Sequence, residues 1–299
     1  MTKKITTRRK VLSSITCGAT LAFSPTCLAN YNRPLSKLSF LVVSDTHLGY
    51  KNSTTAEKRW SQAVAELKSA TGDLVLHLGD VVDGGREDQY AVYLREREKI
   101  GKPVYEIPGN HDPLDLFRKH IRRQIDVAID HKWLKFVLVG NAHTDSHHGF
   151  LTDEQLKWIE SQCHAAVKEQ RYVMLCLHVP VHSNRHPDRG WYVKPENGQT
   201  KLYDIIKRYK QHIVAMLHGH FHNGVRGWKD DGGIHEICLP SVLYNLDRGL
   251  EKQKAAGYNP LEFRAGYTMI TIDNGLMTLD YKPLGADVSI NKKFEFDRA

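Results

Sequence analysis

Short apolar runs alternate with amphipathic stretches along most of the chain from Leu38 onward. Between two of these runs, Trp60, Ala63, Val64 and Leu67 recur at the three- and four-residue spacing of one helix face. Strands that alternate with helices in this way are typical of a layered α/β fold. The six apolar runs that we predict as strands span residues 38–44, 74–78, 103–107, 135–140, 172–177 and 212–217.

Two local signals add a helix start and a hairpin to this picture. Thr152 is followed three positions later by Gln155, a capping-box pattern that predicts a helix beginning just after Thr152. Near the end of the chain, residues 267–281 alternate with period two around Asn274 and Gly275, which is typical of a tight hairpin. The two hairpin strands would extend a mixed sheet.

The first 29 residues differ in composition from the rest. They hold five basic residues and no acid, followed by a short apolar stretch rich in small residues and by Ala29 before a plausible cleavage point. This arrangement is typical of an export signal and is too short to span a bilayer. The adjacent Arg8 and Arg9 resemble the twin-arginine export signal of bacteria, which implies passage through the twin-arginine translocon to a periplasmic or secreted location. We therefore predict an export signal over residues 1–29, a lead-in over residues 30–37 and a single domain over residues 38–299; a basic N-terminal tail is the alternative.

Composition and charge narrow the class of protein. With 299 residues, 41% of them hydrophobic and 25% charged, the chain can bury a substantial core and is not typical of disordered or membrane-embedded proteins. The formal net charge of +8 would suit a nucleic-acid partner, but five of the 42 basic residues lie in the first 29 positions, which leaves 37 basic and 34 acidic residues. The sequence therefore indicates neither a specific nucleic-acid surface nor a transmembrane segment.

Polar side chains follow five of the predicted strands at the point where each strand ends. In an open α/β sheet this is the edge where ligands bind, so we expect these side chains to lie close together. Each motif alone is weak evidence, and their joint occurrence in this order gives the pattern its specificity. The motifs are D-T-H at 45–47, G-D-V-V-D at 79–83, G-N-H-D at 109–112, a histidine at 178 and G-H-F-H at 219–222.

In that order the motifs resemble those of the metallophosphoesterase (calcineurin-like phosphoesterase) superfamily, over about residues 40–281. The resemblance implies a two-sheet sandwich flanked by helices, with a binuclear metal site. It further implies that one metal is bound by Asp45, His47 and His222, that the other is bound by Asn110, His178 and His220, and that Asp80 bridges the two.

The chemistry of these residue types agrees with the resemblance. Imidazole, carboxylate and amide donors without a thiolate suit Mn, Fe or Zn, as two divalent or mixed-valence ions. Two such ions would generate a bridging hydroxide that attacks phosphorus, and with the carboxylates of Asp45 and Asp80 the site would keep a net charge of roughly +1, which attracts a phosphate. By resemblance, His111 is the histidine beside the scissile phosphate, and Asp83 matches the acid that orients it in some members. We expect His111 to protonate the leaving oxygen as a general acid or to stabilise the charge on the equatorial oxygens.

At three positions the chain differs from residues that are typical of two branches of the superfamily, which narrows the branch that it most resembles. Phosphoprotein phosphatases of the superfamily have Arg and Glu where this chain has Gly84 and Asp112. Purple acid phosphatases have a metal-binding Tyr where this chain has Asp83. The pattern is most similar to the cyclic-nucleotide-phosphodiesterase-like (class III) members.

The segment after His178 is the expected source of substrate contacts because loops at the catalytic edge often carry specificity. In it, Arg185, Arg189, Trp191 and Tyr192 could meet a phosphate or stack on a base or sugar, although a solvated loop with Trp191 packed down is an equal alternative. The sequence assigns no role to His143, His147 or His148. We expect His218 to support the site without binding metal, because the ligand set is complete without it.

These observations predict a binuclear metal-dependent phosphoesterase that hydrolyses small phosphodiesters. A broad phosphomonoesterase is the alternative enzyme. A catalytically silent metal-binding scaffold is the alternative from another class, and the filled ligand positions together with His111 argue against it.

Overall fold

Two six-stranded sheets form the centre of the computed structural model, which describes residues 35–183, 190–230, 232–246 and 259–296. The strand order is β12-β11-β10-β1-β2-β3 in the first sheet and β4-β5-β6-β7-β9-β8 in the second. The strands are β1 (Leu38–Val43), β2 (Val75–His77), β3 (Val104–Glu106), β4 (Val127–His131), β5 (Leu134–Val139), β6 (Tyr172–Leu177), β7 (Ile213–His218), β8 (Arg226–Lys229), β9 (His235–Cys238), β10 (Gly266–Asp273), β11 (Leu276–Pro283) and β12 (Ile290–Glu295).

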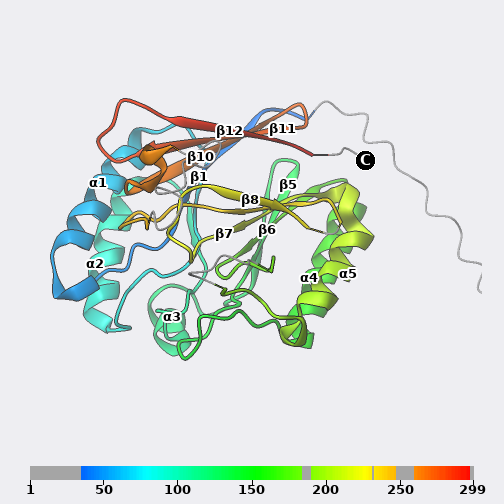
Figure 1. Cartoon of the computed structure of the whole chain (residues 1–299), viewed down its shortest axis with the longest axis horizontal. Helices are drawn as coiled ribbons and strands as arrows, with labels where there is room; N and C mark the ends of the chain where they lie inside the picture. The colour runs from blue at the N-terminus through cyan, green and yellow to red at the C-terminus, as the bar shows by residue number, and fades with distance from the viewer. Residues whose placement is uncertain (1–34, 184–189, 231, 247–258, 297–299) are drawn as a thin grey trace, which may run out of the picture. The chain divides into compact units, whose positions relative to one another are not determined.

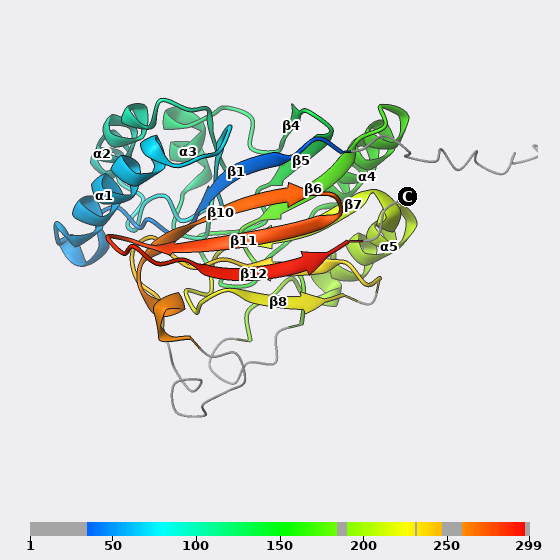
Figure 2. The ribbon, with the colours of Figure 1, turned by 90° about the horizontal axis from the view of Figure 1, so that it is seen from above.

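Helices cover the outer face of the second sheet and that of the first sheet at β1, β2 and β3 (Figure 1), whereas Figure 2 shows no helix over β10, β11 and β12. Apolar residues of α1, α2 and α3 pack on the first sheet, and those of α4 and α5 pack on the second. Between the sheets lies a third apolar cluster, in which the rings of Phe40 and Phe136 meet edge to face at 4.9 Å. The predicted two-sheet sandwich flanked by helices is therefore confirmed. The helices are α1 (Thr55–Ser69), α2 (Glu87–Arg97), α3 (Leu114–His120), α4 (Asp153–Lys168) and α5 (Gln199–Tyr209), with 3₁₀ turns η1 (Tyr50–Asn52), η2 (Glu98–Ile100), η3 (Pro195–Asn197), η4 (Lys210–His212) and η5 (Pro260–Phe263).

The two local signals in the sequence have the expected outcomes. Thr152 Oγ1 accepts the N–H of Gln155 at 3.1 Å and the Gln155 side chain accepts the N–H of Thr152 at 3.0 Å, which completes the capping box of α4. Asn274 and Gly275 have φ angles of 50° and 80° and join β10 to β11 in a tight hairpin. Because β10 pairs antiparallel with β1, the hairpin extends the first sheet into a mixed one.

The strands that sequence patterning missed are mainly edge strands. β4, β8 and β12 each close one edge of a sheet. Edge strands carry charged and polar residues that discourage pairing with other chains, so they lack a clear apolar run. β12 (Ile290–Glu295) contains two lysines and alternates between exposed and partly buried residues after Ile290.

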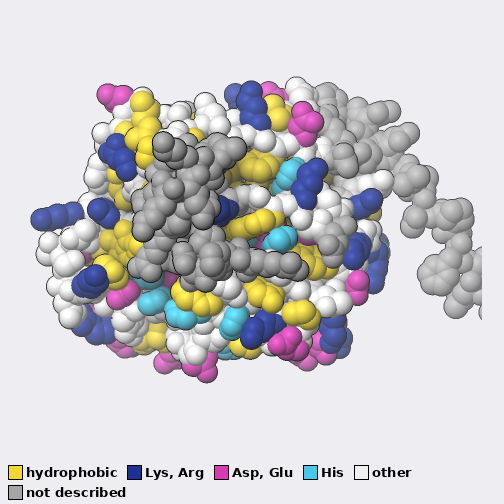
Figure 3. Space-filling model, viewed as in Figure 1, with side chains coloured by type: hydrophobic (Ala, Val, Ile, Leu, Met, Phe, Trp, Pro, Cys, Tyr) yellow, Lys and Arg dark blue, Asp and Glu magenta, His cyan; other side chains and the backbone are white. Residues whose placement is uncertain are grey.

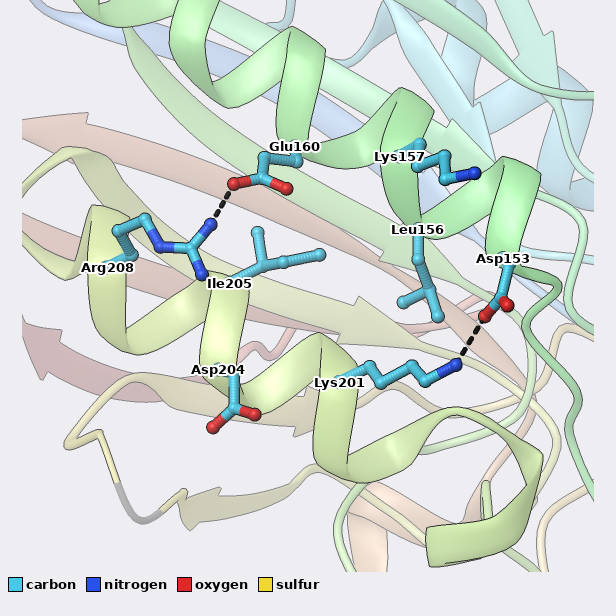
Figure 4. A pocket seen from close by; sticks show the side chains of 8 residues that line it. All are labelled: Asp153, Leu156, Lys157, Glu160, Lys201, Asp204, Ile205 and Arg208. Atoms are coloured by element: carbon cyan, nitrogen blue, oxygen red, sulfur yellow. Dashed lines mark hydrogen bonds and ion pairs between the residues drawn. The ribbon is translucent and has the colours of Figure 1, made fainter.

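α4 and α5 lie side by side on the second sheet and are joined by two ion pairs across a shallow groove. Figure 4 shows Lys201 of α5 pairing with Asp153 of α4, and Arg208 pairing with Glu160. The Lys201 Nζ to Asp153 Oδ1 distance is 2.6 Å, and both side chains are exposed, so water and salt weaken the pair. The groove contains paired charges and none of the predicted site residues.

The direction of the strands brings the predicted site residues together. β1, β2 and β3 run parallel, as do β5, β6, β7 and β9. Five of these strands, β1, β2, β3, β6 and β7, end directly before the motifs, so the motifs meet where the carboxyl ends of both sheets converge.

In the part of the chain that the structure describes, none of the helices has the length and hydrophobicity needed to cross a bilayer. The predicted export signal, Arg185 and Arg189 lie outside the described residues.

Candidate metal centre

Strained backbone turns deliver the candidate ligands from the strand ends. Left-handed backbone is uncommon outside glycine and costs about 1–3 kcal/mol for each residue, so it persists only where the surrounding fold enforces it. Ten non-glycine residues in the described ranges have positive φ, and half of them are candidate ligands. These five are Asp45 (56°), His47 (44°), Asp80 (55°), His220 (72°) and His222 (51°).

Two glycines let these turns approach one another closely. A Cβ on Gly109 would lie 2.1 Å from Asp80 Oδ1. A Cβ on Gly219 would lie 1.9 Å from Ser44 Oγ and 2.9 Å from Asp45 Oδ2. The glycines of the motifs therefore make room for the carboxylates of neighbouring strands.

Asp45, His47 and His222 form one side of the centre, which we call the Asp45 half. His222 Nε2 lies 3.1 Å from Asp45 Oδ1 and 3.1 Å from His47 Nε2. His222 Nδ1 donates to the carbonyl of Tyr244 at 2.9 Å, which fixes Nε2 as the nitrogen that faces the centre. All three side chains are buried.

His178 and His220 form the other side, which we call the Asn110 half because the sequence predicts Asn110 as its third ligand. His178 Nε2 lies 3.2 Å from His220 Nδ1, and His178 Nδ1 donates to the carbonyl of Leu78 at 2.6 Å. Asp80 lies between the halves, with Oδ2 3.4 Å from His47 Nε2 and 3.2 Å from His178 Nε2. Six of the seven predicted ligands thus lie in two buried groups that share Asp80. Asn110 is buried as well, between Gly109 and His111, whose backbones both approach Asp80 Oδ1.

The donor atoms fit bound metal ions. Each half contains two imidazole nitrogens about 3 Å apart, aimed at each other and at a carboxylate oxygen. Asn110 Oδ1 is buried and has no hydrogen-bond partner among the described residues. Buried polar atoms without a partner are costly, and a cation between the donors would satisfy the facing lone pairs. Among the described residues, three sets of ligand atoms are close enough to share an ion. Two are buried and share Asp80, one with Asp45, His47 and His222 and the other with His178 and His220; the third, His47 with Asp83 and His111, is more exposed.

Electrostatics keep the carboxylates ionised. Burial by itself would raise the pKa of Asp45, but the adjacent His222 lowers it below the usual range. Burial opposes ionisation of Asp80 too, and His178 and His47 lower the pKa of that carboxyl well below its ordinary value. Burial would lower the pKa of His178, yet the Asp80 carboxylate raises it to about 9. The centre therefore stabilises positive charge next to Asp80, which is what a cation site requires.

His111 lies beside the Asp45 half, with its ring 4.6 Å from that of His47. The backbone N–H of His111 donates to Asp80 Oδ1 at 2.9 Å. The ring Nδ1 of His111 donates to the backbone carbonyl of Asp83, also at 2.9 Å. The Asp83 carboxylate is 3.6 Å from His111 Nδ1 but only 3.1 Å from His47 Nδ1. The carbonyl of Asp83 thus orients His111, while its carboxylate supports a candidate ligand, a division of roles that the sequence did not predict.

The other histidines and aromatics named from the sequence occupy different places. The ring of Trp191 lies 5.4 Å from that of His220 and stacks on His147. Tyr192 has its ring next to His148, at 6.2 Å. His143 packs edge-on against Phe150. His218 is buried outside both metal groups, with Nε2 3.0 Å from Glu236 Oε1.

Sequence reasoning missed two residues that hold the motif loops together. The buried Asp112 carboxylate accepts the N–H groups of Gly109, Val81 and Val82 at 2.9–3.1 Å, which ties the second and third motifs to each other. Asn141 Oδ1 accepts the N–H groups of His178 and Val179 at 3.1 and 3.0 Å. Asp112 closes the G-N-H-D motif, so only its role went unrecognised, whereas Asn141 directly follows a predicted strand and could have been found by the strand-end criterion.

The chain resembles known phosphoesterases in sequence. Residues 38–224, more than half of the chain, match the family model described as calcineurin-like phosphoesterase. A probable cyclic nucleotide phosphodiesterase of Rhodococcus erythropolis is 26% identical over 295 residues, which cover 90% of each chain. A probable glycerophosphodiester phosphodiesterase of Arcobacter nitrofigilis is 24% identical over 196 residues, 60% of this chain and 70% of that protein.

Solved structures share the fold at lower identity. A dimetal phosphatase from Danio rerio matches with a TM-score of 0.65 at 14% identity, covering 89% of this chain and all of that one. The purple acid phosphatase PPD1 from yellow lupin matches with a TM-score of 0.66 at 15% identity, covering 88% of this chain and 54% of that one. The match to the family model, together with the buried Asp and His groups, supports divalent metal ions at the centre.

Proposed function

The chain belongs to the calcineurin-like phosphoesterase family, and we propose that it hydrolyses small phosphodiesters at the centre formed by the two halves around Asp80. The observation that carries the proposal is the convergence of two buried donor groups on one shared carboxylate. The names of the similar bacterial proteins, cyclic nucleotide and glycerophosphodiester phosphodiesterases, favour diesters over monoesters.

We further propose that the centre holds two ions of Mn, Fe or Zn. One ion would be held by Asp45, His47 and His222, and the other by Asn110, His178 and His220. Asp80 would hold both ions, and no thiolate takes part. Such ions polarise a phosphoryl oxygen and lower the pKa of water enough to supply hydroxide near neutral pH. Only two carboxylates, Asp45 and Asp80, face the ions, so the loaded centre would remain attractive to an anionic phosphate.

We propose that His111 acts as the general acid. Because its Nδ1 donates to the Asp83 carbonyl, Nε2 is the nitrogen left to protonate the leaving oxygen. Burial would lower the pKa of His111, but the Asp80 carboxylate and the Asp83 carbonyl raise it above its ordinary value. The protonated form needed at the start of the reaction is thereby favoured.

A substrate panel at equal metal loading tests the proposal. We expect faster hydrolysis of bis-p-nitrophenyl phosphate than of p-nitrophenyl phosphate, because a diester is the proposed substrate. The reverse preference would favour the alternative function, a broad phosphomonoesterase. Fewer than two bound ions together with no turnover of either compound would contradict the enzyme proposal and favour a silent scaffold.

We also propose that the protein is exported to the periplasm or secreted. The adjacent Arg8 and Arg9, followed by a short apolar stretch, support this proposal. Cell fractionation of the full chain and of an Arg8→Lys, Arg9→Lys double variant tests it. We expect export of the former and cytoplasmic retention of the latter; equal distribution of both would contradict a twin-arginine route.

A further inference from the structure

We propose that His147 and Trp191 form a subsite for one of the two ester groups of the substrate. Cleavage of a phosphodiester releases one ester group and leaves the other on phosphorus, and the subsite binds a planar ring in this retained group. The inference rests on the proposed function and deepens it, because it assigns a substrate class: phosphodiesters whose retained group carries an aryl or heterocyclic ring. Two aromatic pairs flank the centre, one beside each half, and their positions relative to His111 distinguish them.

The His147–Trp191 pair lies against the Asn110 half. The two rings are 4.1 Å apart and 17° from parallel, so they stack. Their centroids lie 5.9 Å and 5.4 Å from that of His220. His147 is exposed and Trp191 is partly exposed, so a ligand at the centre could reach the pair from solvent.

Backbone contacts fix this pair in place. Gly149 and Val193, each two residues beyond one of the two rings, form a parallel bridge, and Val193 donates to the carbonyl of Pro180 at 2.8 Å. A Cβ on Gly149 would lie 2.6 Å from Val193 Cγ2, so the two segments approach as closely as glycine permits. The pair is therefore held ready beside His220, which reduces the entropy cost of binding a ring there.

Tyr50 and Tyr244 form the second pair, beside the Asp45 half. Their rings are 5.1 Å apart, and that of Tyr244 lies 4.6 Å from the ring of His222. Tyr50 donates its N–H to the carbonyl of His47 at 3.0 Å, so this pair is attached to the ligand turns as well. Lys51 Nζ lies 5.0 Å from the centroid of the Tyr50 ring, so one face of that ring is already engaged by a cation.

The position of His111 tells the two pairs apart. Its ring is 4.6 Å from that of His47, a member of the Asp45 half, and the leaving oxygen must be within reach of His111. The leaving group therefore departs on the side of Tyr50 and Tyr244. A diester places its second ester group on another side of phosphorus, and among the described residues the His147–Trp191 pair offers an aromatic surface beside the Asn110 half.

Two substrates with the same leaving group show how much the retained group contributes to turnover. Bis-p-nitrophenyl phosphate and methyl p-nitrophenyl phosphate both release p-nitrophenol, but the first retains an aryl ring and the second a methyl group. For Trp191→Leu we expect kcat/KM to fall by about tenfold with the bis-aryl diester, because stacking of a ring on an aromatic side chain is lost. We expect little change with the methyl diester, unchanged metal content, and recovery of most of the loss in Trp191→Phe.

Two further variants guard against a folding effect. His147→Leu changes an exposed side chain and should reproduce the selective loss on the bis-aryl diester. Trp158→Leu makes the same substitution on α4, away from the motif turns, and should leave the ratio of the two substrates unchanged. An equal loss on both diesters in His147→Leu and Trp191→Leu, or no loss on either, would overturn the subsite. Failure of the wild type to hydrolyse either diester would instead overturn the proposed function.

Discussion

The two halves of the centre contain similar numbers of imidazoles but different charge. The Asp45 half has a carboxylate of its own, and the Asp83 carboxylate lies 3.1 Å from Nδ1 of His47 behind it. The Asn110 half has only neutral donors of its own, and its charge comes from the shared Asp80. Behind His178 stands a backbone carbonyl, and His220 Nε2 has no hydrogen-bond partner among the described residues.

This difference predicts unequal affinity for cations. Carboxylates in contact with a ligand histidine raise its basicity and fix its orientation, so the Asp45 half should hold its ion more tightly. The Asn110 half should exchange its ion more readily and depends on Asp80 for charge. The comparison thus separates residues that both ions need from residues that serve one half only.

The largest effect is expected from Asp80→Ala, because Asp80 serves both halves. Removing it should lower metal content in both and reduce kcat/KM by about 10³-fold or more, since the ions supply several kcal/mol of transition-state stabilisation. Metal analysis and turnover of bis-p-nitrophenyl phosphate measure the two losses. Retention of a full metal complement would show that Asp80 does not bridge the halves.

His111→Ala should separate chemistry from metal binding, because His111 belongs to neither half. We expect the ions to remain and kcat to fall by about 10²–10⁴-fold with a poor leaving group, which needs protonation. The loss should be smaller with p-nitrophenol, a good leaving group. Full activity on a diester with an alkyl leaving group would rule out the acid role.

Asp83→Asn should lower the metal affinity of the Asp45 half, or the activity, by about 10–100-fold. This is the usual effect of removing a hydrogen-bond partner of a metal ligand. His111 should keep its orientation, because the Asp83 carbonyl holds it. Metal titration of this variant beside the wild type measures the effect. If affinity stayed the same and only the leaving-group dependence changed, Asp83 would act through His111, as the sequence first suggested.

His218→Ala should have the smallest effect on activity, although His218 precedes His220 and His222 at the same spacing. The Glu236 carboxylate would lose its partner but keep the N–H groups of Val181 and His182, so we expect destabilisation of about 1–3 kcal/mol. Metal content should not change. Thermal unfolding and metal analysis together check this, and a missing ion would make His218 part of the ligand set.

The apolar runs predicted a layered α/β fold, and the polar residues after them predicted that the ligand residues converge. The two-sheet sandwich was implied by the resemblance to the metallophosphoesterase superfamily. Edge strands such as β12 were missed because their exposed side chains hide the pattern. The division of roles at Asp83 could not be predicted, because it depends on whether a carbonyl or a carboxylate lies nearer to a histidine. The His147–Trp191 stack likewise joins two loops far apart in sequence.

Metal analysis of the purified wild type beside His178→Ala and His222→Ala tests the central claim most directly. We predict two ions per chain in the wild type and one in each variant. The ion left in His178→Ala, held by the Asp45 half, should resist a chelator longer than the ion left in His222→Ala. One ion or none in the wild type, or two ions in both variants, would contradict a centre built from two halves around Asp80.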